Sequence, residues 1–272
     1  MILTGANSYG GGTDLNAGTI QVGADANLGA ATGQLVFDGG TLQYANGFSS
    51  ARSITLNAGG GTIDTNGNNS MLSGAIDGAG GLTKIGAGVL ALSGVGSYSG
   101  ATLVNAGTLQ AGAANVLSPN SAFTLANGAT LNLDGFDNAI GSLAGSGSVA
   151  LGAATLTAGG DGASTDFSGT IDGTGGLVKT GAGMLTLTGA NSYTGLTTVA
   201  AGTLDVNGVL ASIATVDSGA TLKGNGTLGA SRSQARYRCP RNSIGTLNVA
   251  GNVDFAAGSI YQVEANAAGR RR

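Results

Sequence analysis

Aspartate is the residue type with which this chain of 272 residues could most readily do chemistry. Two pairs lie close in the sequence, Asp134 with Asp137 and Asp161 with Asp166. Paired carboxylates can supply the acid and the base or nucleophile that polysaccharide cleavage needs. The chain has one Glu, no Trp to stack on a sugar ring and no basic residue near either pair. Because Asp side chains also bond the backbone of turns, the pattern favours turn residues over a catalytic pair.

The composition excludes several other kinds of site. The chain has no His, so it holds no complete Ser-His-Asp or Cys-His system and no His ligand for zinc or haem. Cys239 is the single cysteine and can form no internal disulfide. We therefore predict no catalytic, cofactor-binding or metal-binding residue in this chain, and no cofactor.

Two glycine-rich segments have a residue spacing similar to that of known ligand-binding motifs. Gly224–Gly229 has the spacing of a dinucleotide-binding fingerprint, but no helical pattern follows it. Gly159–Ser164 begins like a calcium-binding nonapeptide, but Ser164 stands where Asp is needed and no second copy follows. In a chain with 53 Gly such spacings arise by chance, so we interpret both as turns.

Five further residues recur at equivalent places in an internal repeat. Lys84 and Lys179 share one place, and Tyr9, Tyr98 and Tyr193 share another. A lysine beside glycines is typical of a solvated edge, and we predict that role for both lysines rather than a ligand site. We predict that the tyrosines pack at a corner of the fold.

The charges divide the chain in two. Residues 1–230 hold twelve Asp against four basic residues, a balance of −8, whereas residues 231–272 hold seven Arg against two acids, a balance of +5. A basic cluster can bind anionic lipopolysaccharide or nucleic acid. The arginines of 231–241 lack regular spacing and have one interleaved aromatic residue, Tyr237. We therefore predict no nucleic-acid partner.

The chain repeats itself over long distances. Residues 81–112 read GLTKIGAGVLALSGVGSYSGATLVNAGTLQAG, and residues 176–207 read GLVKTGAGMLTLTGANSYTGLTTVAAGTLDVN. A third copy, which lacks the first half, opens the chain at Ile2. Met1 thus falls inside a repeat, and we expect the chain to be a fragment of a longer protein.

A finer repeat lies within the long one. Gly-Thr-Leu/Ile or Gly-Ala-Thr-Leu recurs at Thr19, Thr41, Thr62, Thr108, Thr130, Thr203, Thr221, Thr227 and Thr246. Several neighbours are 18–22 residues apart, and alternating aliphatic and Thr residues indicate half-buried strands. No window shows the 3.6-residue spacing of an amphipathic helix. No apolar run approaches the ~20 residues of a membrane helix, so we expect no transmembrane segment.

Strands that recur with a fixed period predict a solenoid, in which each coil stacks on the next. A coil of about 20 residues fits an all-β fold, a parallel β-helix (β-solenoid) with two or three strands per coil, built as a single elongated rod. We expect Leu and Val to point inward, and Thr, Ser and Asn to point outward or form ladders. Glycine supplies the positive φ of the corners. We expect the narrow interior to leave little room for aromatic rings.

The two complete copies share Gly-Gly-Leu-x-Lys-x-Gly-Ala-Gly-x-Leu-x-Leu-Ser/Thr-Gly-x-x-Ser-Tyr-Ser/Thr-Gly. This pattern resembles the autotransporter-associated β-strand repeat of bacterial type V autotransporter passengers. It spans Gly80–Gly112 and Gly175–Gly208, with a partial copy at Ile2–Gly23, and Asn242–Val249 resembles a segment near the end of such passengers. The resemblance implies a right-handed β-helical passenger at the outer-membrane surface of a Gram-negative bacterium, or outside the cell. It also implies a preceding signal peptide and a C-terminal outer-membrane β-barrel translocator, and we expect both to lie outside this fragment.

Residues 231–241 depart from the repeat pattern. They contain the single Cys and one of the two Pro but no Gly. We interpret this basic insert as the product of compensating frameshifts or as a loop, and Arg270–Arg272 as a third frameshift that ends the chain early. The chain then divides into β-helix passenger repeats at 1–230, the anomalous insert at 231–241 and truncated final coils at 242–272.

The sequence predicts a structural or adhesive rod without a catalytic site of its own, which contacts host or bacterial surface ligands. A reading frame for a barrel directly downstream would support this function. One alternative is a β-helix enzyme that cleaves polysaccharides with Asp; sugar release abolished by Asp134→Ala or Asp161→Ala would favour it. The other alternative is the non-functional product of a decayed autotransporter gene. Failure of the isolated chain to give a β-type circular dichroism spectrum would favour it.

Overall fold

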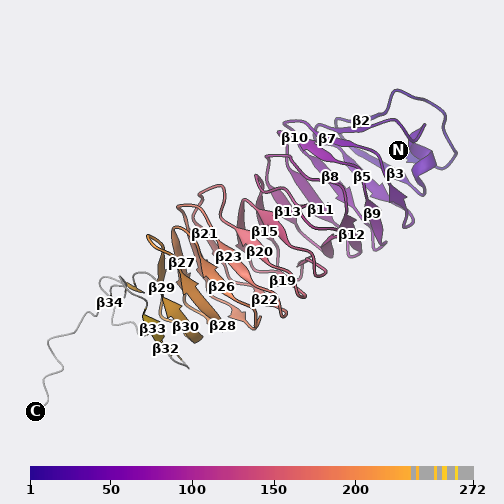
Figure 1. Cartoon of the computed structure of the whole chain (residues 1–272). Helices are drawn as coiled ribbons and strands as arrows, with labels where there is room; N and C mark the ends of the chain where they lie inside the picture. Colours follow the sequence, from indigo (N-terminus) through magenta and orange to yellow (C-terminus); the bar gives the residue numbers. More distant parts are fainter. Residues whose placement is uncertain (234–236, 239–247, 250–252, 256–260, 263–272) are drawn as a thin grey trace, which may run out of the picture.

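Short strands separated by glycine-rich turns make up nearly all the regular structure. The computed structural model describes residues 1–233, 237–238, 248–249, 253–255 and 261–262 (Figure 1). In that part, strands of two to eight residues stack coil upon coil, and strands of neighbouring coils pair in parallel. The coils form one elongated rod with the N-terminus at one end (Figure 1). The predicted all-β parallel β-solenoid is confirmed.

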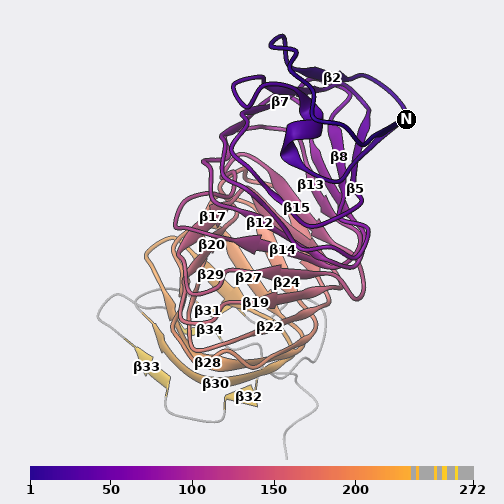
Figure 2. The same ribbon diagram turned by 90° about the vertical axis from the view of Figure 1, so that its right-hand side faces the viewer.

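A complete coil visits three faces of the rod in a fixed order, although several coils have no strand on the second or the third face. Figure 2 looks obliquely along their stack. The first face is a sheet of 14 strands: β1 (Ile2–Leu3), β3 (Thr19–Val22), β5 (Thr41–Tyr44), β8 (Gly61–Asp64), β11 (Leu82–Ile85), β13 (Thr102–Val104), β15 (Ala122–Leu125), β18 (Ser142–Gly145), β21 (Thr165–Phe167), β24 (Met184–Leu187), β27 (Thr203–Val206), β29 (Thr221–Lys223), β31 (Tyr237–Arg238) and β34 (Tyr261–Gln262). The second face is a sheet of seven strands: β6 (Ser49–Ser50), β9 (Ser70–Leu72), β12 (Val89–Leu92), β14 (Thr108–Ala111), β16 (Thr130–Asn132), β19 (Ser148–Ala150) and β22 (Thr170–Asp172).

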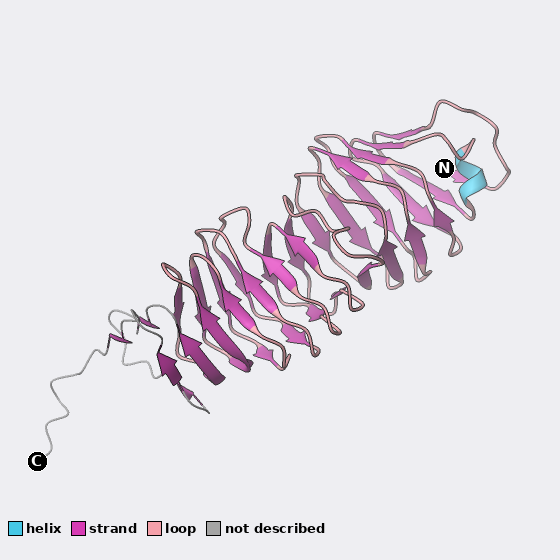
Figure 3. Ribbon diagram, in the orientation of Figure 1, coloured by secondary structure: helices cyan, strands magenta, loops and turns pink. Residues whose placement is uncertain are grey.

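The third face is divided between two sheets. Four strands form its N-terminal part: β2 (Thr13–Leu15), β4 (Leu35–Phe37), β7 (Ile54–Leu56) and β10 (Ile76–Gly78). Nine strands form the later sheet: β17 (Asn138–Ile140), β20 (Leu156–Ala158), β23 (Leu177–Lys179), β25 (Ala190–Asn191), β26 (Thr197–Val199), β28 (Val209–Val216), β30 (Thr227–Ser233), β32 (Asn248–Val249) and β33 (Val253–Phe255). Among the described residues one helical segment occurs, the 3₁₀ helix η1 (Asp25–Leu28; Figure 3). No helix of the described part is long and apolar enough to span a membrane.

The interior is one continuous apolar core that runs along the rod. In β5, Leu42 and Tyr44 are buried while Thr41 and Gln43 are half-buried on the outer side, as the period-2 alternation predicts. The same pattern recurs from strand to strand, so that buried Leu, Val and Ile side chains stack on their counterparts in the next coil. The predicted inward direction of Leu and Val is confirmed for most of them, while a few, such as Leu103 of β13 and Val209 of β28, are exposed.

The expectation that the narrow interior leaves little room for aromatic rings is wrong, because several rings are buried there. Phe37, Phe123 and Phe167 are fully buried. Glycines make the space for some of these rings: a Cβ added to Gly61 would lie 2.5 Å from the ring of Phe37, and one added to Gly169 would lie 2.7 Å from that of Phe167. The chain is poor in aromatic residues, but those it has contribute to the core.

Glycine serves the turns in two different ways. Gly107 has the predicted positive φ, +66°, which side chains with a Cβ adopt with strain. Gly94 has no such φ, but a Cβ there would lie 1.9 Å from the carbonyl oxygen of Gly74 in the preceding coil. Successive turns therefore stack so closely that a methyl group does not fit between them.

The two complete repeat copies lie on different faces. In the first copy, β11 belongs to the first face and β12 to the second. The equivalent strands of the second copy, β23 and β24, belong to the third and first faces. The 95-residue spacing of the copies is therefore not a whole number of coils. The repeat specifies the shape of a coil and its corners, and the spacer determines the face on which each strand lies.

Candidate functional site

Asp134 and Asp137 lie in the exposed turn between β16 and β17, and each carboxylate bonds a different neighbouring coil. Asp134 has a φ of +51° and accepts a hydrogen bond from Gln110 Nε2 at 2.9 Å. Asp137 Oδ1 accepts one from the backbone N–H of Thr155 at 2.6 Å. Both residues lie in a turn, as the sequence predicts for Asp, but their carboxylates contact neighbouring coils and not the backbone of their own turn.

Asp161 and Asp166 are held by different elements. Asp161 lies in the turn before β21, where it accepts hydrogen bonds from Ser142 Oγ at 2.7 Å and from the N–H of Ala163 at 2.9 Å. Asp166 lies in β21 itself, on the exposed outer side. Asp161 raises the pKa of Lys179, a basic residue distant in sequence, through its charge. The lack of a basic neighbour in the sequence was thus misleading.

Gly159–Ser164 is a turn, as predicted, whereas Gly224–Gly229 is a turn only in its first half and then enters β30. Gly224 leads from β29 into β30, which begins at Thr227, so the dinucleotide-like spacing precedes a strand and not a helix. Gly159–Ser164 is the turn between β20 and β21. Among the described residues, no group of three or more His, Cys, Asp or Glu side chains is close enough to hold a metal ion.

The prediction for the two lysines is wrong, because both are buried. Lys84 is 0% exposed, and its Nζ donates to the carbonyl oxygens of Gly86 at 2.7 Å and Ala106 at 3.0 Å. Lys179 is 1% exposed, and its Nζ donates to the carbonyls of Thr180 at 2.6 Å and Gly181 at 3.0 Å. These backbone oxygens replace the water that a surface lysine would have.

The strand alternation contains the clue to this burial. Lys84 stands two residues after the buried Leu82, on the inward side of β11, and Lys179 stands in the same relation to Leu177. Burial lowers the pKa of Lys84 to about 8, an effect that Asp64 opposes. Burial likewise lowers the pKa of Lys179, and Asp161 opposes it.

The predicted packing role of the tyrosines holds for two of the three. Tyr98 and Tyr193 are fully buried, whereas Tyr9 is 40% exposed. Each hydroxyl hydrogen-bonds the threonine four residues later, which for Tyr98 is Thr102 at 2.7 Å. Burial raises the pKa of Tyr98 and of Tyr193 to about 12. Thr102 is itself buried and continues to Ser121 of the next coil at 2.8 Å, so these two residues form a side-chain ladder of the kind expected for Thr and Ser, on the inner side of the rod.

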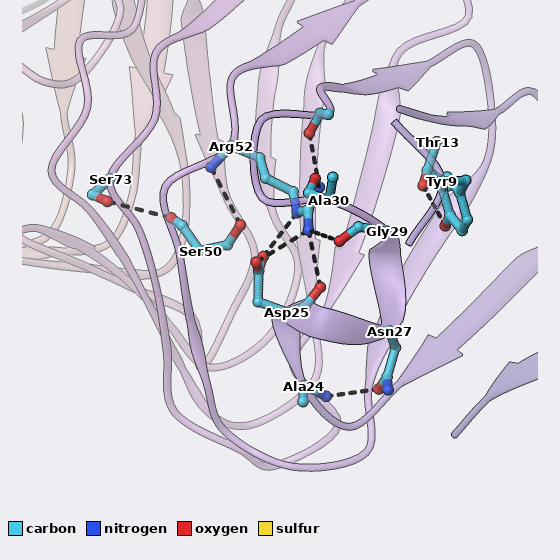
Figure 4. Close-up of polar contacts among 11 residues, drawn as sticks. Tyr9, Thr13, Ala24, Asp25, Asn27, Gly29, Ala30, Ser50, Arg52 and Ser73 are labelled. Carbon is cyan, nitrogen blue, oxygen red and sulfur yellow. Dashed lines mark hydrogen bonds and ion pairs between the residues drawn. The ribbon is translucent and has the colours of Figure 1, made fainter. Parts of the chain in front are cut away.

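Arg52 forms a cluster that the sequence analysis did not identify (Figure 4). It is 2% exposed, and its Nε lies 2.9 Å from Asp25 Oδ1 of η1. The same guanidinium donates to the carbonyls of Gly29 at 2.8 Å and Gly33 at 2.9 Å. The guanidinium of Arg52 thus connects η1 and the loop after it to the following coil. The available clue was again the alternation, since Ser50, Arg52 and Ile54 are all buried.

The basic side chains of residues 1–229 are all engaged. Arg52, Lys84 and Lys179 are buried as described, and Lys223 Nζ lies 3.3 Å from Asp205 Oδ2. Twelve aspartates belong to the same stretch, and ten of them take part in neither of its two ion pairs. The outer surface of this stretch therefore carries carboxylates that no basic side chain balances.

Two shallow concavities mark the described surface. One, of about 370 Å³, has a floor of glycines and alanines and includes Thr62, Thr83 and Leu103. The other, of about 290 Å³, lies where the third face has no strand between β10 and β17, and it includes Val95, Leu117 and Pro119. Neither contains a charged side chain.

The basic insert lies largely outside the described residues. Its first three residues, Ser231–Ser233, continue β30 and pair with Ala214–Val216 of β28. Residues 234–236 and 239–241 are not described, and neither is Arg270–Arg272. Most of the predicted final coils at 242–272 are also outside the described part.

Comparison with known proteins identifies the repeat. The model of the passenger-associated transport repeat matches residues 1–22, 82–111 and 177–206. These are the three copies expected from the sequence, and their resemblance to an autotransporter passenger repeat is confirmed.

Curated relatives match the chain over longer stretches. It is 42% identical over 224 residues to the adhesin BmaC autotransporter of Brucella suis, a match that covers 75% of this chain and 6% of the adhesin. It is also 45% identical over 105 residues to an extracellular serine protease of Serratia marcescens, covering 38% of this chain and 10% of the protease. The chain thus spans a small fraction of these relatives. No solved structure matches it.

Proposed function

We propose that this chain forms part of an autotransporter passenger and serves as a structural or adhesive rod at the bacterial surface or outside the cell. The similarity to adhesin BmaC along three quarters of the chain is the observation that carries the proposal. The three transport-repeat copies and the parallel solenoid support it. A rigid rod suits display, because stacked coils hold their outer side chains at fixed spacings along an extended surface.

The proposal includes a translocator and an export route for the whole protein. The chain corresponds to 6% of a relative that is named an autotransporter. We therefore propose that an outer-membrane barrel belongs to the same whole protein, and that host or bacterial surface molecules are the ligands. The uncompensated carboxylates favour ligands that are neutral or positively charged.

We also propose that the rod has no catalytic site of its own. The carboxylates of Asp134, Asp137 and Asp161 are bonded to neighbouring coils or turns, which favours a structural role over acid and base catalysis. The similarity to an extracellular serine protease does not oppose this, because this chain lacks the His of a Ser-His-Asp triad.

Surface labelling of intact cells tests the proposal. An antiserum raised against the chain should label unpermeabilised producing cells, and external protease should remove the label. Beads coated with the chain should bind host cells or matrix more than beads coated with an unrelated acidic protein. Labelling that needs permeabilised cells would contradict surface display. Release of sugar from acidic polysaccharides, abolished by Asp161→Ala, would contradict the absence of catalysis.

A further inference from the structure

The ammonium group of Lys84 joins three consecutive coils. It bonds Thr65 Oγ1 of the preceding coil at 3.1 Å, the carbonyl of Gly86 in its own turn at 2.7 Å and the carbonyl of Ala106 in the following coil at 3.0 Å. A fourth acceptor is the carbonyl of Ile85 at 3.0 Å. Oxygens of three consecutive coils therefore surround the ammonium group at one corner of the solenoid.

Lys179 repeats this arrangement on another face. Its Nζ bonds the carbonyls of Thr180 and Gly181 in its own turn, and that of Ala201 in the following coil at 3.3 Å. On the preceding coil, its stem packs beside Gly159, whose added Cβ would lie 3.3 Å from Lys179 Cδ. Because β11 and β23 lie on different faces, the arrangement belongs to the repeat and not to a particular side of the rod.

A buried ammonium is costly unless oxygens surround it. Each lysine obtains one of those oxygens from the next coil, which lies about 20 residues later. Its own coil is therefore complete only when the next coil is in place. We propose that the lysine of each repeat is a closure lock, which makes the stability of its own coil depend on the coil that follows. This coupling goes beyond the proposed function and does not depend on export.

A double-mutant cycle read by hydrogen exchange on the whole chain tests the lock. Leu109→Ala loosens the following coil, because Leu109 is a fully buried residue of β14. With Lys84 present, this loss should also increase the exchange of amides in β11, by about tenfold. In the Lys84→Met background, the same loss should change the exchange of the β11 amides by less than about twofold. β12 pairs directly with β14 and should respond in both backgrounds. Met keeps a long apolar stem without the charge.

The second repeat supplies an independent cycle on a different face. Leu204→Ala in β27 loosens the coil after Lys179, and Lys179→Met removes the lock. The amides of β23 should respond to Leu204→Ala with Lys179 and not with Met, whereas β24 pairs directly with β27 and should respond in both backgrounds. If Lys84→Met prevents folding, this second cycle decides. Equal responses of the β11 or β23 amides in the Lys and Met backgrounds would overturn the closure lock; the proposed function is tested separately, by surface labelling of cells.

Discussion

Close contacts between stacked turns determine which residues fit at the corners of the solenoid. The carbonyl of Gly74 lies so close to Gly94 that a Cβ at residue 94 would approach it to 1.9 Å. The second repeat has the same contact, with 1.8 Å between a Cβ on Gly189 and the carbonyl of Gly169. A methyl group at either place forces two stacked turns apart. The glycines of the repeat are thus required by the spacing between coils as well as by backbone conformation.

Gly94→Ala should therefore destabilise the rod by about 1–3 kcal/mol, the usual cost of inserting a group into a packed interior. The measurement is the urea midpoint followed by far-ultraviolet circular dichroism. Gly10→Ala is the matched control, since nothing lies within 4 Å of a Cβ at Gly10, and it should leave the midpoint unchanged. Equal midpoints for the two variants would contradict the close-stacking explanation.

The buried lysines predict an unusual pH dependence. The pKa of Lys84 is about 8 in the folded chain against 10.5 for the free side chain. Between these values the unfolded chain binds more protons than the folded one, so stability should rise with pH. Urea midpoints at pH 7.5, 8.5 and 9.5 should increase for the wild type, and less steeply for Lys84→Met. The range stops near 9.5 because unfolded tyrosines begin to ionise near 10, which acts in the opposite direction for the buried Tyr98 and Tyr193. A wild-type midpoint that falls over this range would refute the prediction.

At the scale of the element, the unit that recurs is a strand, a turn and a second strand. A tyrosine of the turn hydrogen-bonds a threonine of the second strand. Tyr98 closes its turn through Thr102, and Thr102 continues to Ser121 on the next coil. Tyr193 makes the same chain through Thr197 and Ser212. A link that repeats on different faces is a property of the strand–turn–strand unit and not of its surroundings.

Removal of the hydroxyl tests this link. Tyr98→Phe should lower stability by about 0.5–1.5 kcal/mol, because a buried hydrogen bond is lost while the ring stays. Tyr193→Phe should do the same. Tyr9 makes the same bond to Thr13 at 2.9 Å but is 40% exposed, so water can replace it and Tyr9→Phe should have almost no effect. Thermal unfolding of the three variants gives the comparison, and an equal loss in all three would speak against burial as the cause.

The elements also show where sequence reasoning succeeded and where it stopped. Alternation in segments such as Thr203-Leu204-Asp205-Val206 predicted strands and their inward residues, because period 2 is a local property. The surroundings of Lys84 could not be derived in this way, since its acceptor on Ala106 comes from another coil. Arg52 and Asp25 are 27 residues apart in the sequence, so local alternation could not predict their contact either. The repeats predicted that coils stack, but not which residues meet across them.

At the scale of the whole molecule, the rod behaves as a stack in which each coil contacts its neighbours. Its faces are interchangeable to a large extent, because equivalent strands of the two complete repeats lie on different faces. Within residues 1–229 the basic side chains are buried or paired, while ten of the twelve aspartates take part in neither ion pair. Like-charged rods repel one another, which opposes aggregation.

A stack of this kind should accept the loss of one whole coil but not of half a coil. Ser148 of β19 is in register with Thr130 before it and with Thr170 after it. Deletion of residues 148–169 therefore places Thr170 where Ser148 was, and every later strand keeps its face. The shortened chain should fold, with a rod shorter by about 4.8 Å, the spacing of neighbouring strands. Circular dichroism and small-angle X-ray scattering measure both properties.

Deletion of residues 148–158 is the control, because it removes strands of two faces and brings a turn to the position of a strand, so we expect loss of the cooperative transition. If both deletions fold equally well, the order of faces within a coil does not determine the stacking; if neither folds, coils depend on more than their neighbours.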